Sequence, residues 1–223
     1  AGVAVTAVTD GSSVTYDDTV PTLTSVGIAS NNATTTLAAA GDIVTLTLTA
    51  SETIGTPTVT FQSGGAAIND GTIDYVNTGG STWTAKYTAN SSDTDGAVTF
   101  SIAFSDTVGN AGTAVTAVTD GSSVTFDDSV PTLTSVGIAS NNSTATLAKE
   151  GDVVTLTLTA SETIGTPTVT FQSGGAAITN SVTYANPSDN NWTAAYTTHD
   201  SDTDGSVTFS IAFSDSTGNA GVA

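Results

Sequence analysis

The sequence contains no cysteine and no methionine. Without cysteine, no disulfide braces the fold and no thiolate is available for zinc. Arginine is also absent, and two lysines stand against 21 acidic residues, which gives a formal net charge of −19 at pH 7. A surface this negative repels nucleic acid and anionic membranes and attracts cations, so we expect no nucleic-acid partner.

Long apolar runs are absent as well. No stretch approaches the roughly 18–20 apolar residues that a membrane-spanning helix needs, so we expect no membrane insertion. No basic segment followed by an apolar one starts the chain. Because methionine and cysteine are the oxidation-sensitive residues, their absence favours an extracellular location.

An internal repeat organises the whole chain. Residues 1–32 and 111–142 differ at three positions, and residues 51–68 recur unchanged at 161–178. The two copies are 110 residues apart in these segments, and the spacing becomes 109 at Trp83 and Trp192. The sequence therefore contains two copies of one unit of domain size.

Each copy shows alternation of apolar and polar residues, as in Val44, Leu46 and Leu48, which are separated by threonines. A period of two is typical of strands with one buried face and one wet face. The pattern predicts seven antiparallel strands in the first copy, at 22–29, 43–50, 57–62, 72–76, 82–88, 97–105 and 113–126, with a break in the last one near Gly121. The predicted fold is all-β, with tandem immunoglobulin-like β-sandwiches of about seven strands each.

The frame of the repeat predicts how the chain divides. Residues 1–18 correspond to the last strand of a preceding repeat, 19–128 form the first domain, and 129–223 form a second domain that lacks its own last strand. In one interpretation the sequence is a window cut from a longer array. In the other, residues 1–18 of one molecule fill the open edge of the next, which would build a filament.

Acidic residues recur where one domain follows another. In a sandwich of alternating strands, the segment before the first strand, the second-to-third loop and the sixth-to-seventh loop meet at one pole. The residues expected there are Asp17, Asp18, Glu52, Asp106 and Asn110, and in the second copy Asp127, Asp128, Glu162, Asp215 and Asn219.

Such carboxylates have no basic partner, and like charges a few ångströms apart repel by about 1 kcal/mol per pair even in water. Ca²⁺ resolves this repulsion, because it binds ~6–8 oxygen ligands in irregular loops. The sequence therefore predicts a Ca²⁺ site at each joint. A solvated acidic surface is the alternative.

The opposite pole carries a second, looser set of candidate ligands, which comprises Asp93, Asp95, Asp200, Asp202 and Asp204. The segment from Asp200 to Gly205 matches the first half of an EF-hand loop. Ile211 stands at the twelfth position, where an EF-hand needs glutamate, so this is not an EF-hand. A looser calcium loop and an acidic turn both remain open.

Catalytic residues are not apparent in the sequence. His199 is the only histidine, and Asn90 occupies its place in the first copy. No Ser/His/Asp arrangement can be assembled around it, so we expect no enzyme activity. Glycan binding is the weakest alternative, because the two tryptophans and neighbouring tyrosines follow the spacing of core residues.

Three segments carry a family resemblance: DDTVPTLTSVGIASNN (17–32), LTASETIGTPTVTF (48–61) and DTDGAVTFSIAFSDTVGNAG (93–112). They resemble the bacterial Ig-like tandem repeats of giant surface adhesins, including biofilm-associated and RTX-type adhesins. The resemblance covers essentially the whole chain. It implies an extender repeat at the cell surface, often stabilised by calcium, whose partners are neighbouring repeats. It also implies the acids and asparagines of the joints as ligands.

Overall fold

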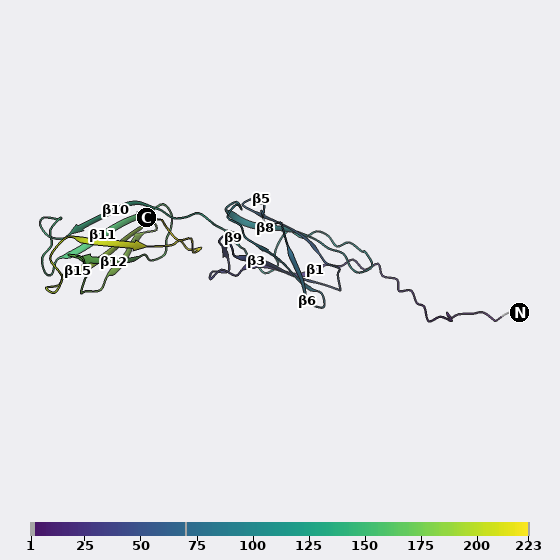
Figure 1. Cartoon of the computed structure of the whole chain (residues 1–223). Helices are drawn as coiled ribbons and strands as arrows, with labels where there is room; N and C mark the ends of the chain where they lie inside the picture. The colour runs from purple at the N-terminus through teal and green to yellow at the C-terminus, as the bar shows by residue number, and fades with distance from the viewer. Residues whose placement is uncertain (1–2, 70, 223) are drawn as a thin grey trace.

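The computed structural model describes residues 3–69 and 71–222, and it shows two β-sandwiches placed end to end (Figure 1). Residues 3–16 extend away from the first sandwich without forming a strand. Among the described residues, no helix is long and apolar enough to cross a membrane.

The first sandwich pairs a four-stranded sheet with a five-stranded one. The first sheet has the order β1 (Leu23–Ser30), β3 (Ile43–Ala50), β7 (Thr82–Thr88), β6 (Asp74–Gly79). The second has the order β2 (Leu37–Ala38), β9 (Thr125–Phe126), β8 (Gly96–Ala103), β4 (Thr58–Ser63), β5 (Ala66–Ala67). These orders correspond to the ABED and GFC sheets of the immunoglobulin fold, so the predicted fold class is confirmed.

The second sandwich repeats most of this topology. Its first sheet has the order β10 (Leu133–Ser140), β11 (Val153–Ala160), β15 (Asn191–Thr197), β14 (Thr183–Ser188). Its second sheet has three strands: β13 (Ala176–Ala177), β12 (Thr168–Ser173), β16 (Val207–Ala212). Within the described part of the chain, β2 and β9 have no counterpart strands here.

Alternation in the sequence decides which side chains enter the core. In β3, Val44, Leu46 and Leu48 are fully buried while the threonines between them face outward. Phe61 packs on Tyr87 with their ring centroids 4.8 Å apart, and Phe171 packs on Tyr196 at 5.0 Å. The first sandwich has one large buried cluster, whereas the second has two smaller buried clusters that both contact the partly buried Ile211.

The last strand, predicted at 113–126 with a break near Gly121, is indeed interrupted. Val115 pairs with Ile102 of β8, but the chain then crosses to β1, where Thr119 N donates to Val26 O at 2.8 Å. The hydroxyls of Thr119 and Ser122 accept hydrogen bonds from the β1 amides of Val26 and Ile28. Serine and threonine hydroxyls compete with a regular ladder in this way, and the positive φ of Gly121 (74°) turns the chain back toward β9.

Candidate metal centre

Three carboxylates meet at the N-terminal pole of each sandwich. They are Asp17, Glu52 and Asp106 in the first sandwich, and Asp127, Glu162 and Asp215 in the second. In each group the ligand oxygens all lie within 4.8 Å of one another. We call them the first and second acidic clusters.

Each acidic cluster draws on three separate segments. The first residue comes from the extended segment before β1 or β10, the glutamate follows β3 or β11, and the last aspartate follows β8 or β16. Isolated bridges from Ile54 to Asp106 and from Ile164 to Asp215 hold the latter two segments together. The sheets therefore determine where the carboxylates converge.

Asp106 is oriented by its own loop. Its Oδ1 accepts hydrogen bonds from the amides of Val108 at 3.0 Å, Gly109 at 2.6 Å and Asn110 at 2.8 Å. Burial opposes ionisation of Asp106, but these bonds and the one from the Asn110 side chain outweigh it and lower the pKa. Asp106 is therefore an anion at neutral pH. The amides of Thr217, Gly218 and Asn219 bind Asp215 in the same way.

The side-chain amides of Asn110 and Asn219, both predicted as ligands, also position each cluster through their Nδ2 atoms. Asn110 Nδ2 donates to Asp106 Oδ2 at 2.8 Å and to the carbonyl oxygen of Asp17 at 3.1 Å. Asn219 Nδ2 donates to Asp215 Oδ2 at 2.8 Å and to Asp127 O at 2.9 Å. Each amide thus ties the loop aspartate to the incoming segment.

The pKa values of the two glutamates, Glu52 and Glu162, are raised in these clusters. Burial, with the added charges of Asp17 and Asp106, raises the pKa of Glu52. Burial and the charges of Asp127, Asp215 and Asp95 likewise raise the pKa of Glu162. The Oε1 atom of Glu52 is buried and has no hydrogen-bond partner among the described residues. A buried, unpaired carboxylate oxygen is costly without a counter-charge.

No lysine supplies that counter-charge. Lys149 Nζ lies 3.2 Å from Asp152 Oδ1, and Lys86 lies opposite Asp74 in the pairing of β7 with β6. Within the described ranges, no ion pair involves an acid of either cluster.

Asp18 and Asp128 lie outside the clusters, although the sequence predicted them as ligands too. Asp18 Oδ2 accepts a hydrogen bond from the Tyr16 hydroxyl at 2.9 Å, and Asp128 Oδ1 accepts one from Ala40 N at 3.3 Å. Successive side chains of an extended segment point to opposite sides, so only one aspartate of each pair faces the loops.

The second, looser set of acids is not brought together. Asp93 accepts hydrogen bonds from the amides of Asn69 and Asn90, and Asp202 accepts them from Thr179 and His199. These aspartates stabilise their own loops. Asp200 Oδ1 lies 2.8 Å from His199 Nδ1. Among the described residues, Asp204 belongs to neither acidic cluster.

Asp95 has a role at the joint between the sandwiches. Its carboxylate accepts hydrogen bonds from Asp128 N at 2.9 Å and from Ser129 Oγ at 2.7 Å. Asp127 N donates to Ala38 O at 2.9 Å, which anchors the same linker to the first sandwich. The segment that delivers Asp127 to the second acidic cluster is therefore held by the first sandwich.

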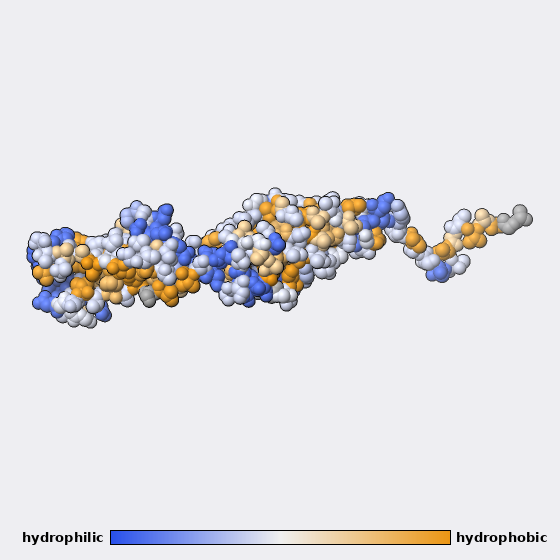
Figure 2. Space-filling view, turned by 90° about the horizontal axis from the view of Figure 1, so that it is seen from above, coloured by the Kyte–Doolittle hydropathy of each residue, from blue (hydrophilic) through white to orange (hydrophobic). Residues whose placement is uncertain are grey.

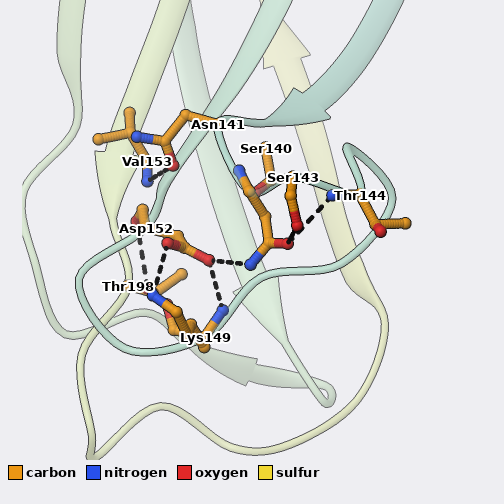
Figure 3. A network of polar contacts seen from close by, with 9 residues as sticks. Ser140, Asn141, Ser143, Thr144, Lys149, Asp152, Val153 and Thr198 are labelled. Atoms are coloured by element: carbon orange, nitrogen blue, oxygen red, sulfur yellow. Dashed lines mark hydrogen bonds and ion pairs between the residues drawn. The ribbon is translucent and has the colours of Figure 1, made fainter.

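The asparagine turn after β1 also crosses the joint. Asn32 Nδ2 donates to Asp42 Oδ2 at 2.8 Å and to Thr217 O of the second sandwich at 2.9 Å. Figure 3 shows the equivalent turn of the second copy, where the Lys149 amide donates to Asp152. Asn142 Nδ2 also donates to Asp152 Oδ2, at 2.7 Å. The contact to Thr217 had no signal in the sequence, because it joins two different surfaces of the repeat.

Comparisons with known proteins give fold-level similarity only. No protein-family model matches the chain, and no curated protein sequence matches it. Among solved structures, the I-band fragment I67-I69 from titin is 13% identical with a TM-score of 0.46, over 89% of this chain and 62% of that one. The DIP-gamma IG1+IG2 structure is 16% identical with a TM-score of 0.37, over 91% and 94%. The chain is thus similar to tandem Ig-like domains, and the similarity extends no further.

Proposed function

We propose that the chain is a structural repeat of an extracellular adhesin, whose joints are stiffened by Ca²⁺. The observation that supports this most is the second acidic cluster. Its three carboxylates lie within 4.8 Å of one another, and one of them, Asp127, belongs to the linker between the sandwiches. A cation bound there would connect the linker to the second sandwich, instead of binding to a single domain.

The donor set favours calcium among biological cations. Both acidic clusters offer only carboxylate oxygens, so softer metals that prefer imidazole or thiolate ligands should bind weakly. Ca²⁺ accepts irregular oxygen ligands from loops, completed by backbone carbonyls and water, whereas Mg²⁺ requires a near-ideal octahedron. Binding would also offset the burial and the like-charge repulsion that together raise the pKa of Glu162.

A bound ion would act mechanically. Asp127 is anchored to the first sandwich through its amide, while Glu162 and Asp215 belong to loops of the second. An ion shared by these three carboxylates would oppose bending at the linker. A stiff row of such repeats suits a spacer on a cell surface, where each repeat has its neighbours as partners and where weak, ~10⁻⁴–10⁻³ M calcium sites are common.

A calorimetric calcium titration of the whole chain tests the proposal. We expect two sites, one per acidic cluster. Glu162→Gln should weaken the joint site about tenfold or more and leave the other unchanged. Glu150→Gln removes the same charge at an exposed position outside both clusters, and should leave both sites intact.

X-ray scattering provides the mechanical readout. With calcium we expect an extended two-domain particle, and with EGTA a broader distribution of bend angles. Absence of binding heat, or scattering that EGTA does not change, would refute the role of calcium.

A further inference from the structure

We propose that Asn32 of the first sandwich is a positioning residue for Asp215 of the second, so that the angle between the sandwiches and cation binding at the second acidic cluster depend on each other. The binding half of this inference rests on the proposed function, and the positioning half does not. We call residues 215–219 the Asp215 loop. The contact that carries the inference joins two residues 185 positions apart in the chain.

The joint between the sandwiches is narrow and polar. Figure 2 shows the two bodies meeting at a waist where hydrophilic residues gather. The bonds of Asp95 and Ala38 reach only the linker at residues 127–129. The bond from Asn32 to Thr217 connects the bodies of the two sandwiches directly. The orientation of the sandwiches therefore depends on a few hydrogen bonds, of which this one is central.

Asn32 is oriented by its own sandwich. Its Oδ1 accepts a hydrogen bond from Thr34 N at 3.0 Å, and its Nδ2 donates to Asp42 Oδ2 at 2.8 Å. Asp42 Oδ2 also accepts a hydrogen bond from Ala39 N at 2.8 Å. These bonds fix the side-chain amide of Asn32 and leave its second Nδ2 hydrogen for a partner across the joint. The donor is thus in place without help from the second sandwich.

The partner of Asn32 is a peptide unit of the Asp215 loop. Asn32 Nδ2 donates to Thr217 O at 2.9 Å, and the amide of the same peptide unit, Gly218 N, donates to Asp215 Oδ1 at 2.7 Å. The peptide is trans, so its C=O and N–H point in opposite directions from one rigid plane. Asn32 and Asp215 therefore hold the two ends of a single peptide plane, one from each sandwich.

This arrangement strengthens the grip of the loop on Asp215. A hydrogen bond to a peptide oxygen polarises the peptide and makes its N–H a better donor, most of all away from water. Thr217 and Asp215 are 4% and 6% exposed. Asp215 Oδ1 also accepts hydrogen bonds from Thr217 N and Asn219 N. Loss of Asn32 should therefore weaken one of three amide donors and leave the other two.

Thr217 also reaches a second carboxylate of the cluster. Its Oγ1 donates to Asp127 Oδ2 at 3.4 Å. Val108, which has no hydroxyl, stands at the equivalent position of the first copy. Two of the three carboxylates of the second acidic cluster thus contact the loop segment that Asn32 holds.

The first sandwich shows that the loop can form without such a contact. There the amides of Val108, Gly109 and Asn110 bind Asp106 Oδ1, although Val108 is 59% exposed. Asn32 therefore restrains a loop that forms by itself. We expect its removal to weaken cation binding by a modest factor and not to abolish it.

The restraint couples the joint to the cluster. Bending that separates Asn32 from Thr217 releases the peptide plane, and a cation held by the cluster would keep the Asp215 loop in the geometry that Asn32 fits. By linkage, the factor by which the contact strengthens cation binding equals the factor by which the cation strengthens the contact. The net contribution of one neutral hydrogen bond corresponds to a factor of about 2–10.

The test compares the unaltered chain with Asn32→Ala and Asn142→Ala. Asn142 is the matched control, because its Nδ2 donates to Asp152 Oδ2 at 2.7 Å just as Asn32 donates to Asp42, and it lies outside both acidic clusters. Loss of the bond within the turn affects both variants. Loss of the contact across the joint affects Asn32→Ala alone.

The first readout is hydrogen exchange in EGTA, followed by NMR. The Gly218 amide should exchange at least ~3-fold faster in Asn32→Ala than in the unaltered chain or in Asn142→Ala. The Gly109 amide makes the equivalent bond in the first sandwich and should exchange equally in all three chains. Unchanged exchange at Gly218 in Asn32→Ala would overturn the positioning role, whether or not the chain binds calcium.

The second readout is a calcium titration of the same three chains, in which the Gly218 and Gly109 signals report the two acidic clusters separately. We expect the second cluster to bind Ca²⁺ about 2–10-fold more weakly in Asn32→Ala, and the first cluster to bind equally throughout. Equal affinity at the second cluster in all three chains would overturn the coupling. Calcium binding by none of them would overturn the proposed function and the coupling together, and exchange at Gly218 would still decide the positioning role.

Discussion

The two sandwiches share most of their sequence but differ at one edge. In the first, residues 113–126 cover β1 and join a single core. In the second, β10 is uncovered, Leu147 and Phe209 are exposed, and two buried clusters are joined through the partly buried Ile211. The body of the repeat therefore forms its sheets without the last segment, while the full burial of the core depends on that segment.

The acidic clusters do not share this difference. Both form the same three-carboxylate group, with the same loop amides bound to the last aspartate. The clusters lie at the N-terminal pole and depend on loops anchored by central strands, so the open edge of the second sandwich leaves its cluster intact. Edge closure and the candidate metal centre are separate features of one repeat.

The largest expected effect comes from Phe126. Phe126→Ala should destabilise the first sandwich by about 3–5 kcal/mol, because the ring is completely buried and its removal leaves a cavity. Tyr16→Ala is the matched change in the exposed segment 3–16 and should leave the unfolding midpoint of the monomeric chain unchanged. Urea unfolding at low protein concentration measures both, and equal effects would contradict the assigned roles.

The glycines of the edge strands give the next largest difference. Gly27→Val should lower the free energy of unfolding by about 1 kcal/mol, since the added side chain displaces the exposed carboxylate of Asp120 from its place over β1. Gly137→Val should change the stability of the monomer little, because the space is open. Thermal unfolding of dilute samples compares the two, and a large loss at Gly137 would show that the edge is already covered.

Hydrogen exchange compares the edges residue by residue. The amides of Val26 and Ile28 are bound to hydroxyls of the covering segment, so we expect them to exchange at least ~10-fold more slowly than those of Val136 and Ile138. NMR of the monomeric chain resolves the four positions. Slow exchange at Val136 and Ile138 in a confirmed monomer would contradict an open edge.

The smallest expected effect is a pH dependence common to both sandwiches. In EGTA, stability should rise as the pH falls from about 7 to about 5, because the raised pKa values of Glu52 and Glu162 make the folded chain bind protons more readily than the unfolded one. The lowered pKa of Asp106 acts in the opposite direction, and its contribution is lost only at more acidic pH. Melting temperatures measure the trend.

Glu52→Gln and Glu162→Gln should each weaken that pH dependence in their own sandwich. Glu150→Gln, which lies outside both acidic clusters, should leave it unchanged. A trend that persists in the double variant Glu52→Gln with Glu162→Gln would assign it to other groups.

Much of the fold follows from the sequence. The strands expected at 43–50 and 82–88 match β3 and β7 to the residue, because threonine alternates there with large apolar side chains. Sorting the loops onto two poles was enough to place Asp17, Glu52 and Asp106 near one another. The short strands β2 and β5 were not predicted, since two residues carry no periodicity.

The details of the site depended on information that periodicity does not contain. Asp17 and Asp18 are adjacent and chemically alike, and only the direction of the extended segment decides which one joins the cluster. Asn110 was predicted as a ligand, and the structure adds that its Nδ2 donates to the Asp17 carbonyl and the Asp106 carboxylate. Asp95 became part of the joint because the linker passes within hydrogen-bond reach.

The sequence by itself determined the repeat, the strand order and the excess of negative charge, since these follow from local alternation and composition. Only the tertiary structure decided which carboxylates meet and which glycine lies under a covering segment. The physical reason is that strand formation depends on neighbours in sequence, whereas clustering of charge and closure of an edge depend on segments about 90 residues apart that the packed sheets bring together.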